Sequence, residues 1–212
     1  MVASAHLAMV AKLGILGSGH GSNMEAIATA CQGGQLPADV ALVLSDVADA
    51  PILDRALERG IAAQAIDPGH FRSKLSDEAE RQFIDTLKSA QIDWVILAGF
   101  MRIIKSDFLR AFPERIVNIH PSLLPSFPGL NATQQALDYG VGITGTTVHI
   151  VDQGIDTGAI IAQEPVRVQP GDTPERLQQR IKETEHQLYP RALTELVTGR
   201  IRVTGRTITR ST

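Results

Sequence analysis

The sequence lacks the features that mark several large classes of protein. It has one cysteine, Cys31, so it cannot form an internal disulfide, and we expect an inert thiol on a helix. No apolar run approaches the roughly 20 residues that span a bilayer, and the first residues lack the regions of a signal peptide. We therefore expect a cytoplasmic protein with no membrane partner.

An excess of one charge is also missing. The 20 basic and 23 acidic residues give a net charge of -3, and no basic stripe is evident, so we expect a small-molecule partner and no nucleic acid. The 212 residues, 43% of them hydrophobic, suffice for a sizeable core. We predict a single domain over 12–200, an N-terminal extension over 1–11, and a C-terminal strand and tail over 201–212.

Short β-branched runs alternate with amphipathic stretches in the first half of the chain. From residue 12 the runs are KLGILG, NMEAIATACQ, DVALVLSD, APILDRALERG and IAAQAI, a pattern typical of parallel strands joined by helices. A helix over 76–90 then precedes WVILAGF, which is apolar on both faces and predicts a central strand. The sequence predicts an α/β fold with a mostly parallel central sheet and helices on both faces.

The second half departs from this alternation. We expect a strand at 115–120, a proline-rich loop that leads into a helix within 121–140, and strands at 142–151 and 159–168. A long helix should begin near Thr173, with Pro174 at its first position, and stop at Gly199. Pro190 predicts a kink in that helix.

A glycine-rich loop, GSGHGSN at 17–23, lies between the first strand and the first helix. Free backbone N–H groups and the helix dipole favour an anion there. Ser22 stands where a dinucleotide-binding fingerprint has its third small residue, so a phosphate monoester fits better than a cofactor pyrophosphate. The alternative is a tight turn in which Ser22 or Asn23 caps the helix.

Asn118 and His120 stand two residues apart in NIHPSLLP, at the end of a predicted strand, so they project from the same face. An amide can stabilise an oxyanion, and an imidazole can move a proton near neutral pH, which suits addition to a carbonyl. An orienting carboxylate would come from Asp152 or Asp156 in VDQGIDTG. A structural histidine and plain turn aspartates are the alternatives.

One carboxylate is predicted within the apolar stripe of the last helix. Glu185 falls on the same face as Leu177, Ile181, Leu188, Ala192 and Leu196. Facing a cleft, Glu185 would offer a partner to a substrate ammonium or amide N–H. The alternative is that helix twist or the Pro190 kink turns it to solvent.

With these motifs in this order, the sequence resembles the phosphoribosylglycinamide formyltransferase family, the folate-dependent enzymes of purine synthesis. NIHPSLLP, AGFMRI, GSGHGSN and the Asp156 turn all match over residues 12–199. The resemblance implies the Rossmann-like formyltransferase fold and transfer of the formyl group of 10-formyltetrahydrofolate to the amine of glycinamide ribonucleotide. It implies these two molecules as partners, no metal, and a monomer or homodimer.

The resemblance also implies a role for each candidate residue. The catalytic trio would be Asn118, His120 and Asp156. Gly21, Ser22 and Asn23 would bind the substrate phosphate, and Glu185 would bind the glycinamide end. The folate would lie beside the 151–156 loop and contact, largely through backbone groups, the segment Met101, Arg102, Ile103 and Ile104.

The roles of three residues and four rival functions stay open. Asn131 stands where many relatives have a histidine after FPGL, and Arg72 or Lys74 could add a cation for the phosphate. A formyltetrahydrofolate deformylase would use water as the acceptor, and a tRNA formyltransferase would add an RNA-binding domain. A dinucleotide-dependent oxidoreductase or a non-catalytic phosphate-binding module needs only the glycine loop.

Overall fold

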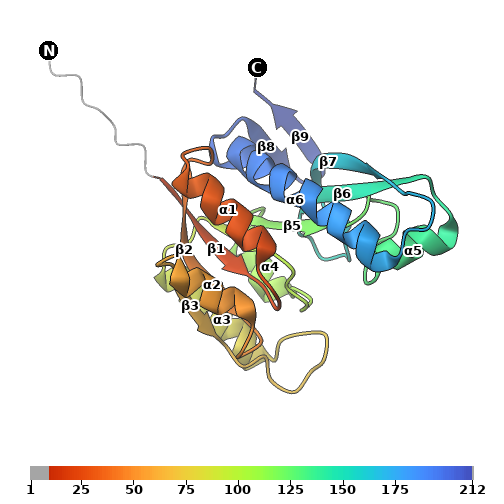
Figure 1. Ribbon diagram of the computed structural model, residues 1–212. Coiled ribbons are helices and arrows are strands. Elements are labelled where there is room, and N and C mark those ends of the chain that lie inside the picture. Colours follow the sequence, from red (N-terminus) through yellow and green to blue (C-terminus); the bar gives the residue numbers. More distant parts are fainter. Residues whose placement is uncertain (1–9, 212) are drawn as a thin grey trace, which may run out of the picture.

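A seven-stranded sheet forms the centre of the computed structural model, which describes residues 10–211 (Figure 1). Its strands are β1 (Ala11–Leu16), β2 (Ala38–Ser45), β3 (Ala62–Ala65), β4 (Trp94–Leu97), β5 (Ile116–His120), β6 (Ile143–Ile150) and β7 (Ile160–Arg167), in the spatial order β3-β2-β1-β4-β5-β6-β7. Strands β1 to β5 pair in parallel, whereas β6 and β7 are antiparallel to their neighbours. The predicted mostly parallel sheet is confirmed.

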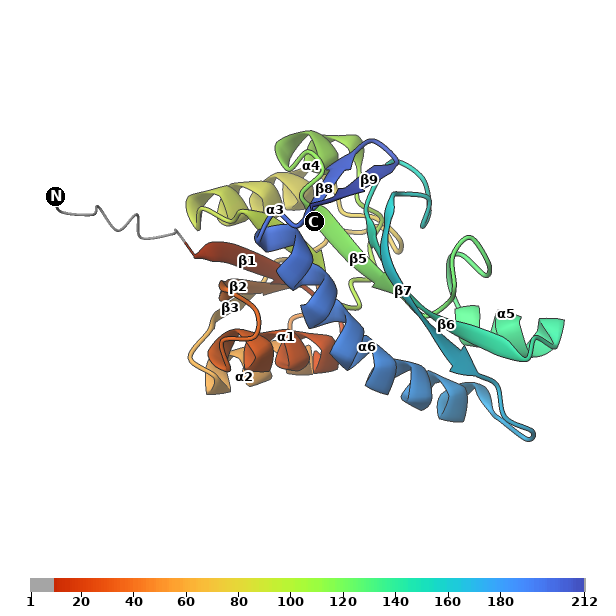
Figure 2. The same ribbon diagram turned by 90° about the horizontal axis from the view of Figure 1, so that it is seen from above.

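Helices cover both faces of this sheet (Figure 2). One core cluster joins the sheet to α1 (Ser22–Gln32), α2 (Pro51–Glu58) and α6 (Pro174–Val197), and a second joins it to α3 (Asp77–Ser89) and α4 (Ser106–Ala111). Ile15 and Leu16 of β1 belong to different clusters because successive side chains of a strand project to opposite faces. Helix α5 (Ala132–Tyr139) packs beside α6 near β6.

Local signals account for the ends of the longer helices. The Ser76 hydroxyl accepts from the Ala79 N–H at the start of α3, and Thr173 caps α6, with Pro174 as its first residue. Helix α6 ends at Val197, just before Gly199 at φ +70°. It continues through Pro190 without a break, and the kink expected there stays a prediction.

The structure adds detail at both ends of the predicted domain. Strand β1 begins at Ala11, which pairs with Ala38, and residues 1–9 of the expected N-terminal extension lie outside the described part. At the other end, two strands replace the predicted C-terminal strand. Strands β8 (Ile201–Thr204) and β9 (Thr207–Arg210) form a hairpin because the two-residue turn contains Gly205 at φ +59°.

No helix within residues 10–211 is both long and apolar enough to cross a membrane.

Candidate active site

The strand register aligns three chain segments at one edge of the sheet. Leu16 of β1 pairs with Leu97 of β4, and Leu97 pairs with Asn118 of β5. The glycine loop (residues 17–23), the 101–104 segment and the end of β5 therefore leave neighbouring parallel strands at their carboxyl ends. Ligands of open α/β sheets bind at this edge, next to the point where the strand order reverses.

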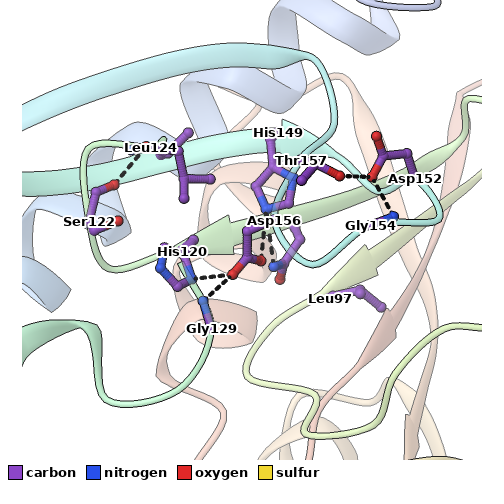
Figure 3. A network of polar contacts seen from close by, with 12 residues as sticks. Leu97, His120, Ser122, Leu124, Gly129, His149, Asp152, Gly154, Asp156 and Thr157 are labelled. Atoms are coloured by element: carbon purple, nitrogen blue, oxygen red, sulfur yellow. Dashed lines mark hydrogen bonds and ion pairs between the residues drawn. The ribbon is translucent and has the colours of Figure 1, made fainter. Parts of the chain in front are cut away.

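The structure brings His120 and Asp156 into direct contact at this edge (Figure 3). His120 Nδ1 lies 3.3 Å from Asp156 Oδ2, and both side chains are largely buried. His120 Nε2 lies 2.9 Å from the Phe127 carbonyl oxygen. Because each ring nitrogen faces an oxygen acceptor, both contacts are satisfied together only when the ring carries two protons.

Asp156 is fixed by its own backbone and by a neighbouring loop. It adopts φ +54°, a conformation that Asp tolerates better than most residues, and its Oδ2 accepts the Gly129 N–H at 2.8 Å. Asp152 instead accepts the Thr157 hydroxyl at 2.6 Å and the Gly154 N–H at 3.1 Å, within its own turn. Of the two aspartates that the sequence left open, Asp156 is the one facing the imidazole.

Asn118 reaches this cluster through a histidine that the sequence analysis missed. Its Nδ2 lies 3.3 Å from His149 Nε2, and His149 Nδ1 lies 2.9 Å from the Ile150 carbonyl oxygen. Burial is the largest influence on His149 and lowers its pKa, so the ring is neutral at neutral pH. A neutral ring that donates from Nδ1 accepts the amide hydrogen at Nε2, which fixes the orientation of Asn118.

His149 also lies near the carboxylate, with its Nε2 3.6 Å from Asp156 Oδ1. It stands opposite Asn118 in the antiparallel β5–β6 pair. The only signal in the sequence was a histidine within an otherwise apolar and Thr-rich strand. The predicted trio therefore lies together, with His149 between the amide and the carboxylate.

The glycine loop forms the start of α1 without a side-chain cap. Gly21 is the N-cap residue at φ +80°, so the alternative in which Ser22 or Asn23 caps the helix is wrong. A Cβ on Gly21 would lie 2.7 Å from Ile52 Cγ1, so only glycine fits there. Since no side chain within residues 10–211 caps this first turn, its N–H groups are available to an anion.

Asn23 and Glu185 contact each other beside this helix start. Asn23 Nδ2 donates to Glu185 Oε2 at 2.8 Å, and Glu185 is 4% exposed, so the alternative of a solvent-facing carboxylate is wrong. Burial raises the pKa of Glu185 to about 7, although the Asn23 hydrogen bond acts in the opposite direction. Because the side-chain amide of Asn23 donates to Glu185, the backbone N–H of Asn23 is the group that can donate to a phosphate.

Tyr189 shows where α6 crosses the sheet. Its hydroxyl oxygen lies 3.0 Å from the carbonyl oxygens of Leu97, the last residue of β4, and of Val117 in β5. Glu185 lies one helical turn earlier, where its carboxylate contacts Asn23 at the start of α1.

The 101–104 segment exposes apolar side chains next to this edge. Met101 is 60% and Ile103 52% exposed, whereas Ile104 is buried. The N–H groups of Met101 and Ile103 already donate to the Ser18 hydroxyl and the Ser73 carbonyl. A flat ring placed here would therefore meet two apolar side chains and the remaining backbone groups.

The structure also places four further residues that the sequence analysis named. Asn131 is the N-cap of α5 at φ +58°, a left-handed conformation that Asn tolerates. The loop with Arg72 and Lys74 lies against the 101–104 segment, where the backbones of Lys74 and Ile103 form an isolated parallel β-bridge. Cys31 lies half-buried on α1, and burial raises the pKa of its thiol to about 11, so it is protonated at neutral pH.

A cavity of about 820 Å³ opens elsewhere, between α1 and α6. Ser22 lines one end, and the wall carries both cationic and anionic side chains, which include Arg59, Glu25, Arg191, Glu195 and Arg200. None of the predicted trio lines it. Among residues 10–211, no group of three or more His, Cys, Asp or Glu side chains is arranged to hold a metal ion.

Comparisons with known proteins agree on one family. A family model described as formyl transferase matches residues 11–193. The chain is 40% identical over 186 residues to the phosphoribosylglycinamide formyltransferase of Bacillus subtilis, covering 88% of this chain and 94% of that protein. It is 44% identical over 190 residues to the trifunctional purine biosynthetic protein adenosine-3 of Drosophila melanogaster, but this covers only 14% of that longer protein.

Solved structures give the same result. Glycinamide ribonucleotide transformylase 1 from Symbiobacterium toebii superposes with a TM-score of 0.90 at 44% identity, covering 95% of this chain and 94% of that one. A formyltetrahydrofolate deformylase from Pseudomonas syringae pv. tomato has a TM-score of 0.87 at 25% identity, and the match covers 96% of this chain and 66% of that one. The fold is shared by both enzymes, whereas the sequence is closer to the first.

Proposed function

The chain belongs to the formyl transferase family, among its phosphoribosylglycinamide formyltransferases, and on this premise we propose that it formylates the amine of glycinamide ribonucleotide with 10-formyltetrahydrofolate. The predicted family, fold and class of folate-dependent formyltransferase in purine biosynthesis are confirmed. We further propose that residues 12–200 act as one catalytic domain in the cytoplasm, as a monomer or homodimer.

The phosphate of the ribonucleotide binds at the start of α1 in this proposal. The backbone N–H groups of Gly21, Ser22 and Asn23 carry no side-chain cap, and the helix dipole favours an anion at this position. Glu185 contacts Asn23 and faces the same region, so it would bind the glycinamide end of the substrate. Once ionised, its carboxylate would attract the substrate ammonium.

The folate would lie against Met101, Arg102, Ile103 and Ile104, with its formyl group directed to the trio. The exposed Met101 and Ile103 side chains provide an apolar surface for the ring. This segment follows β4, and the trio stands at the end of the adjacent β5 and in the 151–159 loop. The reacting groups of both substrates would therefore meet at this edge.

The chemistry follows from the three side chains. The substrate amine attacks the formyl carbon, and the carbonyl oxygen becomes an oxyanion. Asn118 Nδ2 has two hydrogens, one of which is held by His149, so the other is oriented to donate to that oxygen. Protonated His120 is the second donor. Its Nε2–H would leave the Phe127 carbonyl oxygen and donate to the oxyanion instead.

Asp156 Oδ2 lies 3.3 Å from His120 Nδ1 and would hold the imidazole in one orientation. A proton must leave the attacking nitrogen and another must reach N10 of the folate before the intermediate collapses. The His120–Asp156 pair can carry out this transfer, directly or through water. Collapse then breaks the bond from the formyl carbon to N10 and releases formylglycinamide ribonucleotide and tetrahydrofolate.

The single observation that carries this proposal is the convergence of an amide, an imidazole and a carboxylate beside an uncapped helix start. The test mixes the protein with glycinamide ribonucleotide and 10-formyltetrahydrofolate and follows release of the deformylated folate spectroscopically. We expect release that depends on the ribonucleotide. Equal release without it, accompanied by formate, would instead identify a deformylase.

A further inference from the structure

A buried carboxylate outside the trio joins the segments that carry the two predicted binding sites. Asp46 follows the last residue of β2, and its side chain is 1% exposed. Its Oδ1 accepts the Ser18 hydroxyl at 2.5 Å, and its Oδ2 accepts Arg102 Nε at 2.6 Å. Ser18 belongs to the glycine loop and Arg102 to the 101–104 segment.

Ser18 links these two segments a second time. Its hydroxyl oxygen accepts the Met101 N–H at 2.9 Å, and its own N–H donates to the Gly99 carbonyl at 3.1 Å. The hydroxyl therefore donates its one hydrogen to Asp46 while its oxygen accepts the Met101 N–H. A shift of the glycine loop would disturb the backbone of the 101–104 segment through this contact.

Arg102 extends the network to a third loop. Its Nη1 lies 2.7 Å from the Phe71 carbonyl and 2.5 Å from the Arg72 carbonyl, while its Nε is held by Asp46. The Arg102 side chain is 15% exposed, so protein groups rather than solvent surround most of it. Hydrogen bonds to ionised groups are stronger than neutral ones, which makes these contacts suited to fixing loop positions.

A plain stabilising ion pair is the alternative, but it explains the arrangement poorly. Removing two charges from water offsets much of their attraction, so buried pairs are weak sources of stability. Every hydrogen bond recorded for the Asp46 carboxylate goes to a segment that carries a predicted binding site. Within residues 10–211, no recorded hydrogen bond joins this network to Asn118, His120 or Asp156.

We propose that Asp46 is a positioning residue that holds the phosphate-binding glycine loop and the folate-binding 101–104 segment in one arrangement. It contacts neither substrate, yet both depend on it. This inference rests on the proposed function, because it assumes that these two segments bind the ribonucleotide and the folate. A displacement of about 1 Å in such a segment lowers binding or rate by as much as about 100-fold.

The test compares Asp46→Asn with the wild type and with Asp49→Asn. Asn keeps the shape but cannot accept from both Ser18 and Arg102 with full strength. Asp49 is an exposed carboxylate three residues further on, for which no hydrogen bond or ion pair is recorded among residues 10–211, so it is the matched control. Titration calorimetry with glycinamide ribonucleotide and with tetrahydrofolate gives each Kd without turnover, because tetrahydrofolate has no formyl group.

We expect Asp46→Asn to raise both Kd values and both KM values about tenfold or more, with kcat at saturation within about threefold of wild type. Asp49→Asn should change none of them. A purely structural role would lower the melting temperature without this separation of KM from kcat. A rise in only one Kd, no rise in either, or a fall in kcat alone would overturn the inference.

Ser18→Ala is the second variant and keeps the test decisive if Asp46→Asn does not fold. It removes the link from the glycine loop to Asp46 and Met101 but leaves the Arg102–Asp46 pair. We expect both Kd values to rise here too, and unchanged folate binding would contradict the inference. A wild-type protein that binds neither ligand would instead reject the proposed function, and the inference with it.

Discussion

The Glu185→Gln substitution gives the most specific prediction about stability, because the Glu185 carboxylate is buried and hydrogen-bonds to Asn23. Its pKa in the folded protein is about 7, against 4.5 for the unperturbed group. The folded state therefore keeps a proton that the unfolded chain loses at lower pH. Stability from this group is fully present below pH 4.5 and is lost as the pH rises through about 7.

The size of the effect follows from the shift in pKa. A difference of about 2.5 in pKa, at about 1.4 kcal/mol for each unit, gives a loss of about 3 kcal/mol between pH 4.5 and pH 8. Glutamine has nearly the same shape, and its carbonyl oxygen can accept from Asn23 Nδ2, so it keeps the contact without the titration. All other groups titrate in both proteins, and their effects cancel in the comparison.

Urea unfolding of both proteins at several pH values from 4.5 to 8 measures this difference. We expect the wild type to lose stability relative to Glu185→Gln by about 3 kcal/mol across the range, which shifts the urea midpoint by roughly 1 to 3 M. Parallel stability curves for the two proteins would refute the reasoning, since they would show that Glu185 does not titrate between these limits.

The remaining predictions concern the trio and the glycine loop. Asn118→Ala should lower kcat by about 100-fold or more, measured as formyl transfer at saturation, because it removes an oxyanion donor. His149→Ala should lower kcat less than Asn118→Ala, since it only frees the orientation of the amide. Asp156→Asn should lower kcat on the order of 100-fold with KM nearly unchanged. Gly21→Ala should lower the free energy of unfolding by about 1 to 2 kcal/mol or more and weaken ribonucleotide binding, because alanine is strained at φ +80° and contacts Ile52. Urea unfolding measures the loss of stability, and calorimetry measures the loss of binding.

Much of the fold was predictable because periodicity is a local property. Alternation of β-branched runs with amphipathic stretches gave β1 to β4 and the helices between them, and Ser76 and Thr173 marked helix starts by their capping chemistry. Helix α4 has only six residues, too few for a periodic pattern to appear. The C-terminal hairpin was missed because its second strand is short and largely polar.

A local sequence pattern predicted which site residues share a face only where they are close in sequence. Asn118 and His120 share a strand, so their common face followed from a period of two. The contact of Asn118 with His149 depends on the β5–β6 register, which no local pattern specifies. The same holds for Asp46, which meets Ser18 and Arg102 only after three separate strands have assembled.

The central claim is that the trio moves a formyl group from folate to an amine, and the fate of the formyl carbon tests it most directly. The wild-type protein and His120→Ala are each given glycinamide ribonucleotide and folate with an isotopically labelled formyl carbon, and the products are analysed by mass spectrometry. We predict labelled formylglycinamide ribonucleotide from the wild type and at least about 100-fold slower formation by His120→Ala. Label found in free formate, or transferred equally fast by the variant, would contradict the account.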